Sequence, residues 1–534
     1  MGLVMTNMTK EDITLISISD YVYYFAAKTP DAEAVVLGDQ RLTYQQLADE
    51  VDGCAKGLIS MGIEKGDRVA TLCTPCPDYF IMLMATASLG AIWVGLNPKY
   101  TIDELSYVLM DAEPRAIFSR TEITAKSSTR NYCSDLQSLK SKCSITEHIV
   151  ALDNTNDTSV DFTYDQFLDQ GRPVETKTLR QKQSLVSKDD PALIVYTSGT
   201  SGKPKGALLP HGGLISCSQM QNRIYNCDPL RVVNYLPINH IGCVGDISLW
   251  VMAAGGTIVF MEHFDPHESM EIIQREEITA WGGVPTAILM CMALPNFDQY
   301  DLSSIQSIFW SGAAAPEELV VALSAITESL GNCYGQTETV GSITFLPPCN
   351  DVELLTNTIG KPPEGYDIRI VTSDGRDTDV GEVGEIIVKG DFIMTGYWRR
   401  PEATAETIDE QGYLHTGDLA SWREDGYIKL VGRIKEMFKS GGYNVYPREI
   451  EQVLESFPSV DMAAVISVPD PIFSEVGYAF IIDSKGELDE DALKAHCRDH
   501  LANYKIPKKF IIKPVLPMLP IGKIDKMALK RTIS

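Results

Sequence analysis

The sequence has no apolar run able to cross a membrane, no paired metal-binding motif and no excess of positive charge. Its most apolar stretch, 79–96, is interrupted by Ser88, Gly90 and Gly95, which favours a buried helix running into a strand. A formal charge of −26 argues against nucleic acid or anionic membrane surfaces as general partners. The composition therefore disfavours membrane-spanning and nucleic-acid-binding proteins.

The twelve cysteines show no arrangement typical of a metal site. Cys73-Thr74-Pro75-Cys76 is a single CxxC motif without a second pair or paired histidines, so structural thiols are expected in place of a zinc site. No secretory signal precedes these cysteines. Because reduced thiols are typical of the cytosol, we expect a cytoplasmic protein.

Length and charge indicate more than one domain. A chain of 534 residues, 44% hydrophobic and 22% charged, is typical of a globular protein too long for one core. From Arg433 to the end there are 15 basic and 14 acidic residues, against 31 and 58 in the first 432. We predict a large domain over residues 1–432, a hinge over 433–437 and a small α+β domain over 438–534.

Predicted helices and strands alternate along the large domain. Helices are expected from Thr43 to near Gly62, from Pro77, Ile102 and His211, and over 266–276, with strands at 67–72, 91–94, 192–195, 256–260 and 305–309. Residues 120–188 are polar and poorly periodic, so we expect them to be peripheral. The alternation predicts an α/β fold with helix-covered sheets. Short strand patterns separated by turn residues predict a small antiparallel unit with tight turns over about 360–432.

The most unusual stretch is Tyr196-Thr197-Ser198-Gly199-Thr200-Ser201-Gly202-Lys203-Pro204-Lys205-Gly206. Its glycines and hydroxyls allow sharp turns with exposed N–H groups, and its two lysines add positive charge, which suits a polyphosphate. It is not a Walker loop, because the spacing from Gly199 to Lys203 is wrong and Pro204 replaces the required hydroxyl. A flexible surface loop of the same composition is the alternative.

This stretch resembles the phosphate loop of the adenylate-forming superfamily, which includes acyl-CoA synthetases, peptide-synthetase adenylation domains and beetle-type luciferases. Further segments resemble the family's other motifs in the same order, at 236–242, 310–316, 334–339, 415–418, 440–451 and 520–526. The resemblance covers nearly the whole chain. It implies a large N-terminal α/β domain with the phosphate loop at 196–206, a small distorted β-barrel, and a mobile α+β C-terminal lid.

The resemblance also implies roles for individual residues. ATP or AMP would contact Thr197, Ser198, Gly199, Thr200, Ser201, Gly202, Lys203, Gly312, Ala313, Ala314, Tyr334, Gly335, Gln336, Thr337, Asp418 and Arg433. Tyr334 would stack on adenine, and the Asp418 carboxylate would accept both ribose hydroxyls. Thr197 and Glu338 would hold Mg²⁺, and both would belong to the catalytic residues together with Lys523 and His240.

Three further groups of residues follow from the same resemblance. The acyl pocket would contain His240, Ile241, Gly242, Trp310, Val340 and Gly341; the hinge would be Lys435; and coenzyme A would contact Gly441, Gly442, Tyr443, Lys505 and Lys508. Read without the resemblance, His240 is a packed core histidine, 310–316 is tight strand-to-helix packing, and Lys523 is a solvated turn. Asn239 replaces the family's more usual Phe, which puts the shape of the pocket wall in doubt.

The implied reaction is ATP-dependent ligation of a carboxylic acid to coenzyme A through an acyl-adenylate, with release of pyrophosphate and AMP. Gly242, Gly312 and Gly341 suggest room for a medium- or long-chain fatty acid or an aryl acid. Asp246 could face a cationic acid, although a helix cap is the default interpretation. One alternative is an adenylating enzyme that stops at acyl-AMP or serves a carrier protein, and another is a nucleotide sensor without turnover. The expected partners are the small-molecule acid, ATP and coenzyme A, and a homodimer is compatible with them.

Overall fold

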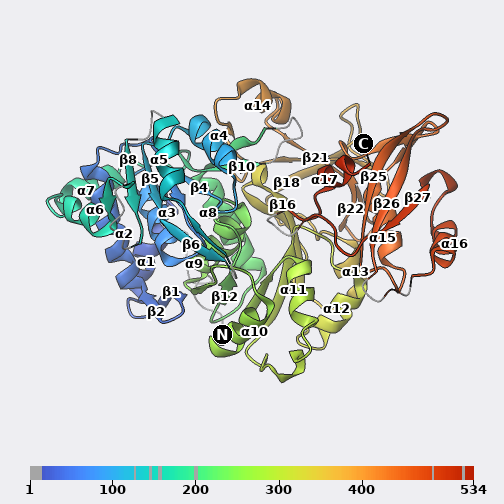
Figure 1. Ribbon diagram of the computed structural model, residues 1–534, viewed down its shortest axis with the longest axis horizontal. Helices are drawn as coiled ribbons and strands as arrows, with labels where there is room; N and C mark the ends of the chain where they lie inside the picture. Colours follow the sequence, from blue (N-terminus) through green and yellow to red (C-terminus); the bar gives the residue numbers. More distant parts are fainter. Residues whose placement is uncertain are drawn as a thin grey trace.

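The computed structural model describes residues 15–125, 128–142, 147–153, 159–197, 203–483, 486, 488–519 and 523–533. Within these residues, two eight-stranded sheets with their helices form the larger body, and a five-stranded sheet lies at the C-terminal side (Figure 1). The roles predicted for Ser198, Gly199, Thr200, Ser201 and Gly202 concern residues outside the described part of the chain.

The first sheet has the order β20-β11-β10-β4-β3-β5-β8-β9. Its strands are β3 (Arg68–Leu72), β4 (Ile92–Leu96), β5 (Ala116–Ser119), β8 (His148–Ala151), β9 (Phe162–Thr163), β10 (Pro191–Thr197), β11 (Lys205–Pro210) and β20 (Gly396–Tyr397). All pairs from β10 to β9 are parallel. The prediction that 120–188 is only peripheral is wrong for β8, because its apolar residues pair along buried β5.

The second sheet has the order β17-β16-β15-β14-β12-β13-β1-β2. Its strands are β1 (Glu33–Leu37), β2 (Gln40–Thr43), β12 (Arg231–Asn234), β13 (Thr257–Phe260), β14 (Ala280–Gly283), β15 (Ser307–Ser311), β16 (Leu330–Gln336) and β17 (Gly341–Phe345). The six central strands are parallel, and the two outermost strands run antiparallel. The strand expected at 305–309 starts two residues later, because Ile305 ends a turn closed on Leu302.

Helices cover both sheets, and one helix is almost entirely enclosed. They are α1 (Asp20–Lys28), α2 (Tyr44–Ser60), α3 (Pro77–Ser88), α4 (Ile102–Ala112), α5 (Cys133–Lys142), α6 (Tyr164–Gly171), α7 (Thr176–Gln183), α8 (His211–Ile224), α9 (Trp250–Ala254), α10 (Pro266–Arg275), α11 (Pro285–Met292), α12 (Glu317–Ser324), α13 (Val352–Asn357) and α14 (Pro401–Thr407). Short helical turns are η1 (Gly242–Leu249), η2 (Phe297–Gln299) and η3 (Thr337–Thr339), and a hairpin joins β6 (Glu122–Ala125) to β7 (Ser128–Asn131). Every residue of α3 except Asp78 is buried, as the uncharged run predicts. Thr43 begins α2 by accepting the Gln46 N–H, which confirms the predicted cap.

The region expected to form a distorted barrel is built around an antiparallel sheet of β18 (Asp367–Val371), β19 (Gly384–Lys389), β21 (Leu414–Trp422) and β22 (Ile428–Arg433). After it come β23 (Phe438–Ser440), β24 (Tyr443–Val445), β25 (Met462–Asp470), β26 (Ser474–Ile482), β27 (Lys509–Ile512), α15 (Pro447–Glu455), α16 (Glu490–His500), η4 (Asn503–Lys505) and α17 (Lys526–Arg531). This part has its own apolar core around Phe438, Val465 and Leu493. It is the small α+β domain that the sequence predicts.

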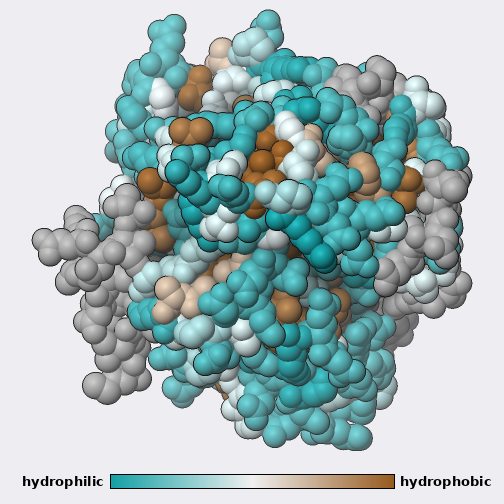
Figure 2. Space-filling model, turned by 90° about the vertical axis from the view of Figure 1, so that its left-hand side faces the viewer, coloured by the Kyte–Doolittle hydropathy of each residue, from teal (hydrophilic) through white to brown (hydrophobic). Residues whose placement is uncertain are grey.

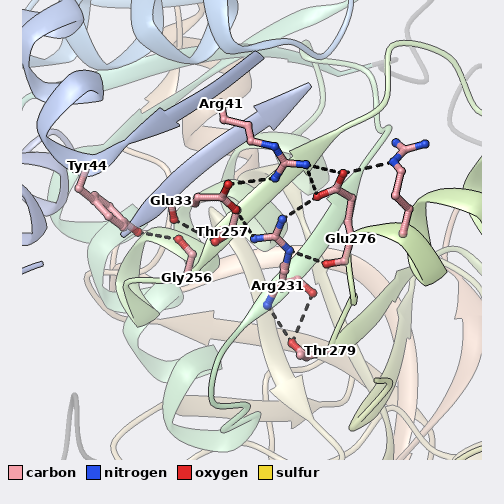
Figure 3. Close-up of polar contacts among 9 residues, drawn as sticks. Glu33, Arg41, Tyr44, Arg231, Gly256, Thr257, Glu276 and Thr279 are labelled. Atoms are coloured by element: carbon pink, nitrogen blue, oxygen red, sulfur yellow. Dashed lines mark hydrogen bonds and ion pairs between the residues drawn. The ribbon is translucent and has the colours of Figure 1, made fainter. Parts of the chain in front are cut away.

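An ion-pair cluster around the buried Glu276 joins strands β1, β2 and β12 of the second sheet to the end of α10 (Figure 3). The side chain of Glu276 is only 2% exposed and receives Arg41 at 2.8 Å and Arg231 at 2.7 Å. Arg231 also reaches Glu33 at 2.8 Å. Because a carboxylate this buried requires paired donors, the cluster links β1 and β2 to β12 and to the end of α10.

The face formed by the N-terminal elements is mostly hydrophilic, with its apolar residues in small separate groups (Figure 2). In the described part of the chain, no helix combines the length and apolar character needed to span a membrane. Cys73 and Cys76 are fully buried, with sulfurs 3.8 Å apart.

Candidate active site

A cavity of about 1360 Å³ opens where parallel strands of both sheets end. Its lining includes Thr197 at the end of β10, Gly283 at the end of β14, Ser311 at the end of β15 and Gln336 at the end of β16. The carboxyl ends of parallel strands are the usual place for a ligand site in α/β proteins. Lys523 and Lys526 of the small domain line the same cavity, so both domains contribute to it.

The two residues expected at the metal lie together. Oε1 of Glu338 accepts a hydrogen bond from the Tyr397 hydroxyl at 2.8 Å and from Oγ1 of Thr197 at 3.4 Å. Among the described residues, no three carboxylate, histidine or cysteine side chains gather as a metal cage. One carboxylate with a hydroxyl beside it fits Mg²⁺, which usually takes one or two carboxylates and completes its shell with phosphate oxygens and water.

Asp418 is the centre of a hydrogen-bonded group of expected nucleotide residues. Its Oδ2 accepts from the Tyr334 hydroxyl at 2.6 Å and from Nε2 of Gln336 at 3.1 Å, and Nε of Arg433 lies 2.8 Å from Oδ1. Asp418 is 2% exposed, and its charge raises the pKa of Arg433. Asp418 and Tyr334 are not among the residues that line the cavity. Next to them, Gln336, Gly417 and Arg433 do line it. A carboxylate oxygen can accept more than one bond, so the group retains capacity for hydroxyl donors.

Lys523 and His240 face the cavity from different domains. A Cβ added at Gly312 would lie 3.4 Å from Cε of Lys523, so the lysine stem packs against this glycine at φ +83°. Burial lowers the pKa of Lys523, and the nearby Arg433 charge lowers it further. Burial, with the charge of Lys523, lowers the pKa of His240 to about 4, so the imidazole is neutral near pH 7. Its Nδ1 accepts the Gly242 N–H at 3.0 Å, which leaves the ring proton on Nε2.

Most other expected residues divide between those that line the cavity and those that do not. Lys203, Gly312, Gly335, Thr337, Lys435, Ile241, Gly242, Trp310 and Gly341 line it. Val340 is fully buried with φ +59°, and Ala313 and Ala314 are exposed outside the lining. Gly441, Gly442, Tyr443, Lys505 and Lys508 also lie outside it: Tyr443 stacks on Tyr504, Lys505 pairs with Glu449, and Lys508 lies over Phe473.

Several lining residues carried no recognisable sequence signal. Gln221 on α8 and Trp250 at the start of α9 both line the cavity. Asp246 also lines it, and the helix-cap interpretation is wrong because the residue lies inside the π-helix η1. Asn239, the departure from the family pattern, donates to the Tyr100 hydroxyl at 3.1 Å. Of these residues, Asp246 is the one that η1 itself carries into the cavity lining.

Comparison with known proteins identifies the family. A model of AMP-binding enzymes matches residues 22–398, and a model of their C-terminal domain matches 449–523. A feruloyl-CoA synthase of Amycolatopsis sp is 33% identical over 95% of this chain and 97% of its own length. The mitochondrial medium-chain acyl-CoA ligase ACSF2 of Rattus norvegicus is 30% identical over 95% of this chain and 85% of its own.

Solved structures share the fold over nearly the whole chain. ATP-bound MatB from Rhodopseudomonas palustris superposes with a TM-score of 0.83 and 27% identity, covering 97% of this chain and 99% of that one. The amide bond synthetase McbA from Marinactinospora thermotolerans superposes with a TM-score of 0.82 and 26% sequence identity. The match covers 97% of this chain and 100% of McbA. These matches confirm the predicted fold class, and ATP, Mg²⁺ and coenzyme A are the cosubstrates and metal of the class. The chain therefore belongs to the AMP-binding enzymes, in the AMP-forming acyl-CoA synthetase branch of the adenylate-forming superfamily.

Proposed function

We propose that this enzyme activates a medium- or long-chain fatty acid or an aryl acid as its adenylate and passes the acyl group to coenzyme A. The observation that carries the proposal is the position of Lys523, which enters from the small domain and packs on Gly312 in the same cavity as His240 and Glu338. The glycines Gly242, Gly312 and Gly341 line the cavity and leave space beside His240 and Trp310, which supports an acid larger than acetate.

The proposed first step brings two anions together. The Lys523 ammonium offsets the repulsion between the acid carboxylate and the α-phosphate, and it stabilises charge that develops there. The neutral His240 offers its Nε2–H to an acid oxygen without competing for the phosphate. When bound, Mg²⁺ neutralises phosphate charge, and Glu338 with Thr197 would hold it. Asp418 would fix the ribose, so that carboxylate oxygen and phosphorus meet in line.

The proposed second step requires the small domain to move. In the described arrangement Lys523 occupies the cavity, while Gly441, Gly442 and Tyr443 lie outside its lining. We propose domains at 1–432 and 438–534 with rotation about Lys435 in a hinge at 433–437, which withdraws Lys523 and brings the glycines to the acyl carbon. Lys505 and Lys508 would then help to bind the phosphates of coenzyme A. A cytoplasmic location fits these soluble cosubstrates.

The test is a panel of carboxylic acids assayed for ATP–pyrophosphate exchange without coenzyme A and for AMP formation with it. We expect exchange with C6–C12 or aryl acids, and AMP release that depends on coenzyme A. Exchange without thiol dependence would instead favour an enzyme that stops at acyl-AMP or delivers it to a carrier protein or an amine, a candidate that the McbA likeness supports. Absence of exchange with every acid would refute the proposal.

A further inference from the structure

One carboxylate in the cavity takes no part in the chemistry proposed above. Asp246 lies on η1, about one helical turn beyond Gly242, and lines the cavity together with His240 and Trp310. The π-helix is rare and often marks functional sites, because its extra residue per turn redirects a side chain. Here the redirected side chain is an acid in a wall that also contains Ile241, Trp250 and Phe309.

Only half of the Asp246 carboxylate is bonded by the protein. Its Oδ1 accepts from the backbone N–H and from Oγ of Ser342, both at 3.1 Å. Oδ2 accepts no hydrogen bond from the described residues, and no Lys, Arg or His among them forms an ion pair with Asp246. Nε2 of Gln221 donates to the Asp246 backbone carbonyl at 2.9 Å, which holds the residue in place.

The surrounding backbone makes room for this carboxylate. Gly341 has φ +131°, and a Cβ added there would lie 2.9 Å from Oδ1 of Asp246. Any larger residue would therefore push the carboxylate away and be strained in its own backbone. The next residue, Ser342, supplies both donors. The start of β17 thus binds Oδ1 of Asp246 and leaves Oδ2 available to accept a hydrogen bond.

The groups around Asp246 cannot balance its charge. Cys217, Tyr225 and Cys333 are the titratable side chains that feel it, and burial raises the pKa of each, so all three stay neutral. Burial also raises the pKa of Asp246 to about 6, which still leaves it ionised at pH 7.5. An ionised carboxylate only accepts hydrogen bonds, and leaving one of its oxygens without a donor in a half-buried position is unfavourable.

We infer that Asp246 makes the cavity selective for carboxylic acids that carry an N–H or O–H donor at the end remote from the reacting carboxylate. This rests on the proposed function and narrows its substrate class. An acid ending in a hydroxyl or ammonium group would donate a hydrogen bond to Oδ2 of Asp246. An acid ending in a methyl group would shield this oxygen from water without offering it a donor. Sites built to bond a donor reject the analogue that lacks it, because the buried acceptor is then left unpaired.

The test uses acids of equal size that differ in one terminal group. Heptanoate, 6-hydroxyhexanoate and 6-aminohexanoate form an aliphatic series, and 4-methyl-, 4-hydroxy- and 4-aminocinnamate form an aromatic one. In the series that is turned over, we expect kcat/KM for a donor acid to exceed that for the methyl acid by about tenfold or more. The D246L variant should reverse this preference, and the ATP KM should be unchanged. The hydroxyl and amino arms distinguish O–H from N–H donors.

A binding measurement decides the matter even without turnover. Dissociation constants of non-hydrolysable acyl-sulfamoyl-adenosines that carry the same terminal groups should show the same preference, and D246L should reverse it. The D298N variant, changed at an exposed residue, is the matched control and should keep the wild-type ratio. Equal binding of donor and methyl analogues by wild type, or an unchanged ratio in D246L, would overturn the inference. Failure of the proposed function would appear separately, as absence of pyrophosphate exchange with every acid.

Discussion

Replacing Asp246 with Asn separates the energetic cost of the half-buried carboxylate from its role toward the substrate. Asn keeps the shape and retains an oxygen acceptor for Ser342 but carries no charge. Burial raises the pKa of Asp246 from 3.8 to about 6, so the folded protein binds this proton more tightly than the unfolded chain. Ionisation therefore opposes folding, and the loss of stability develops as pH rises from about 4 to 6.

The size of the effect follows from that difference. At about 1.4 kcal/mol per pKa unit, the ionised carboxylate costs at most about 3 kcal/mol above pH 6. For a cooperative unit of about 400 residues, that corresponds to a rise in Tm of roughly 3 °C on its removal. The D246N variant should be more stable than wild type at pH 7.5, and the difference should vanish at about pH 4.

The assay is thermal unfolding of ligand-free wild type and D246N in matched buffers between pH 4 and 8. The D298N variant controls for the loss of one formal charge at an exposed position. A Tm difference that does not change with pH, or a D246N variant less stable at pH 7.5, would refute the reasoning. In that case the free oxygen has a partner in solution and the selectivity argument weakens as well.

Four other substitutions follow from contacts described above. K523A should lower ATP–pyrophosphate exchange by about 10²–10³-fold and leave thioester formation from supplied acyl-AMP within a few-fold, and a parallel loss of both would contradict its placement. E276Q leaves Arg41 and Arg231 with Glu33 as their remaining charge partner and should cost about 1–3 kcal/mol in chemical denaturation, whereas an unchanged midpoint would show that Glu276 is dispensable for stability. G341A should lower the free energy of unfolding by about 1–3 kcal/mol and raise the KM of the acid, as measured by unfolding and by steady-state kinetics. A neutral result would mean that the contact between Gly341 and Asp246 is not tight. K508E should raise the KM of coenzyme A without changing exchange, and impaired exchange would assign Lys508 to the first step.

Much of the architecture was predictable because local signals agree with the fold. Thr43 and Thr101 form capping boxes at the N-termini of α2 and α4, and Pro77 is the first residue of α3. The apolar runs of β3, β4 and β10 are typical of strands buried on both faces. The place of β8 in the first sheet was missed, since four residues between polar segments carry little periodicity and pairing with β5 is a tertiary effect.

The site was predictable where residues occur in motifs and not where distant elements meet. Glu338 with Thr197 and Asp418 with Arg433 are brought together as expected. The second hydrogen-bond partner of the Glu338 side chain is Tyr397, which is 59 positions away and in no motif named from the sequence. Asp246 was expected in the site only as the alternative to a helix cap, because the hydrophobic pattern of 242–249 does not distinguish the π-helical register from an ordinary helix.

The short strand β20 has a consequence for how the large domain can be divided. Through Ala207 and Leu208 it covers the outer edge of β11, and its Tyr397 bonds Glu338 at the far sheet. A fragment ending before residue 390 would therefore expose a bare strand edge, which invites aggregation, and would leave Glu338 loosely held. Fusion, splitting or exchange of modules in this protein should consequently be attempted only on the C-terminal side of β22.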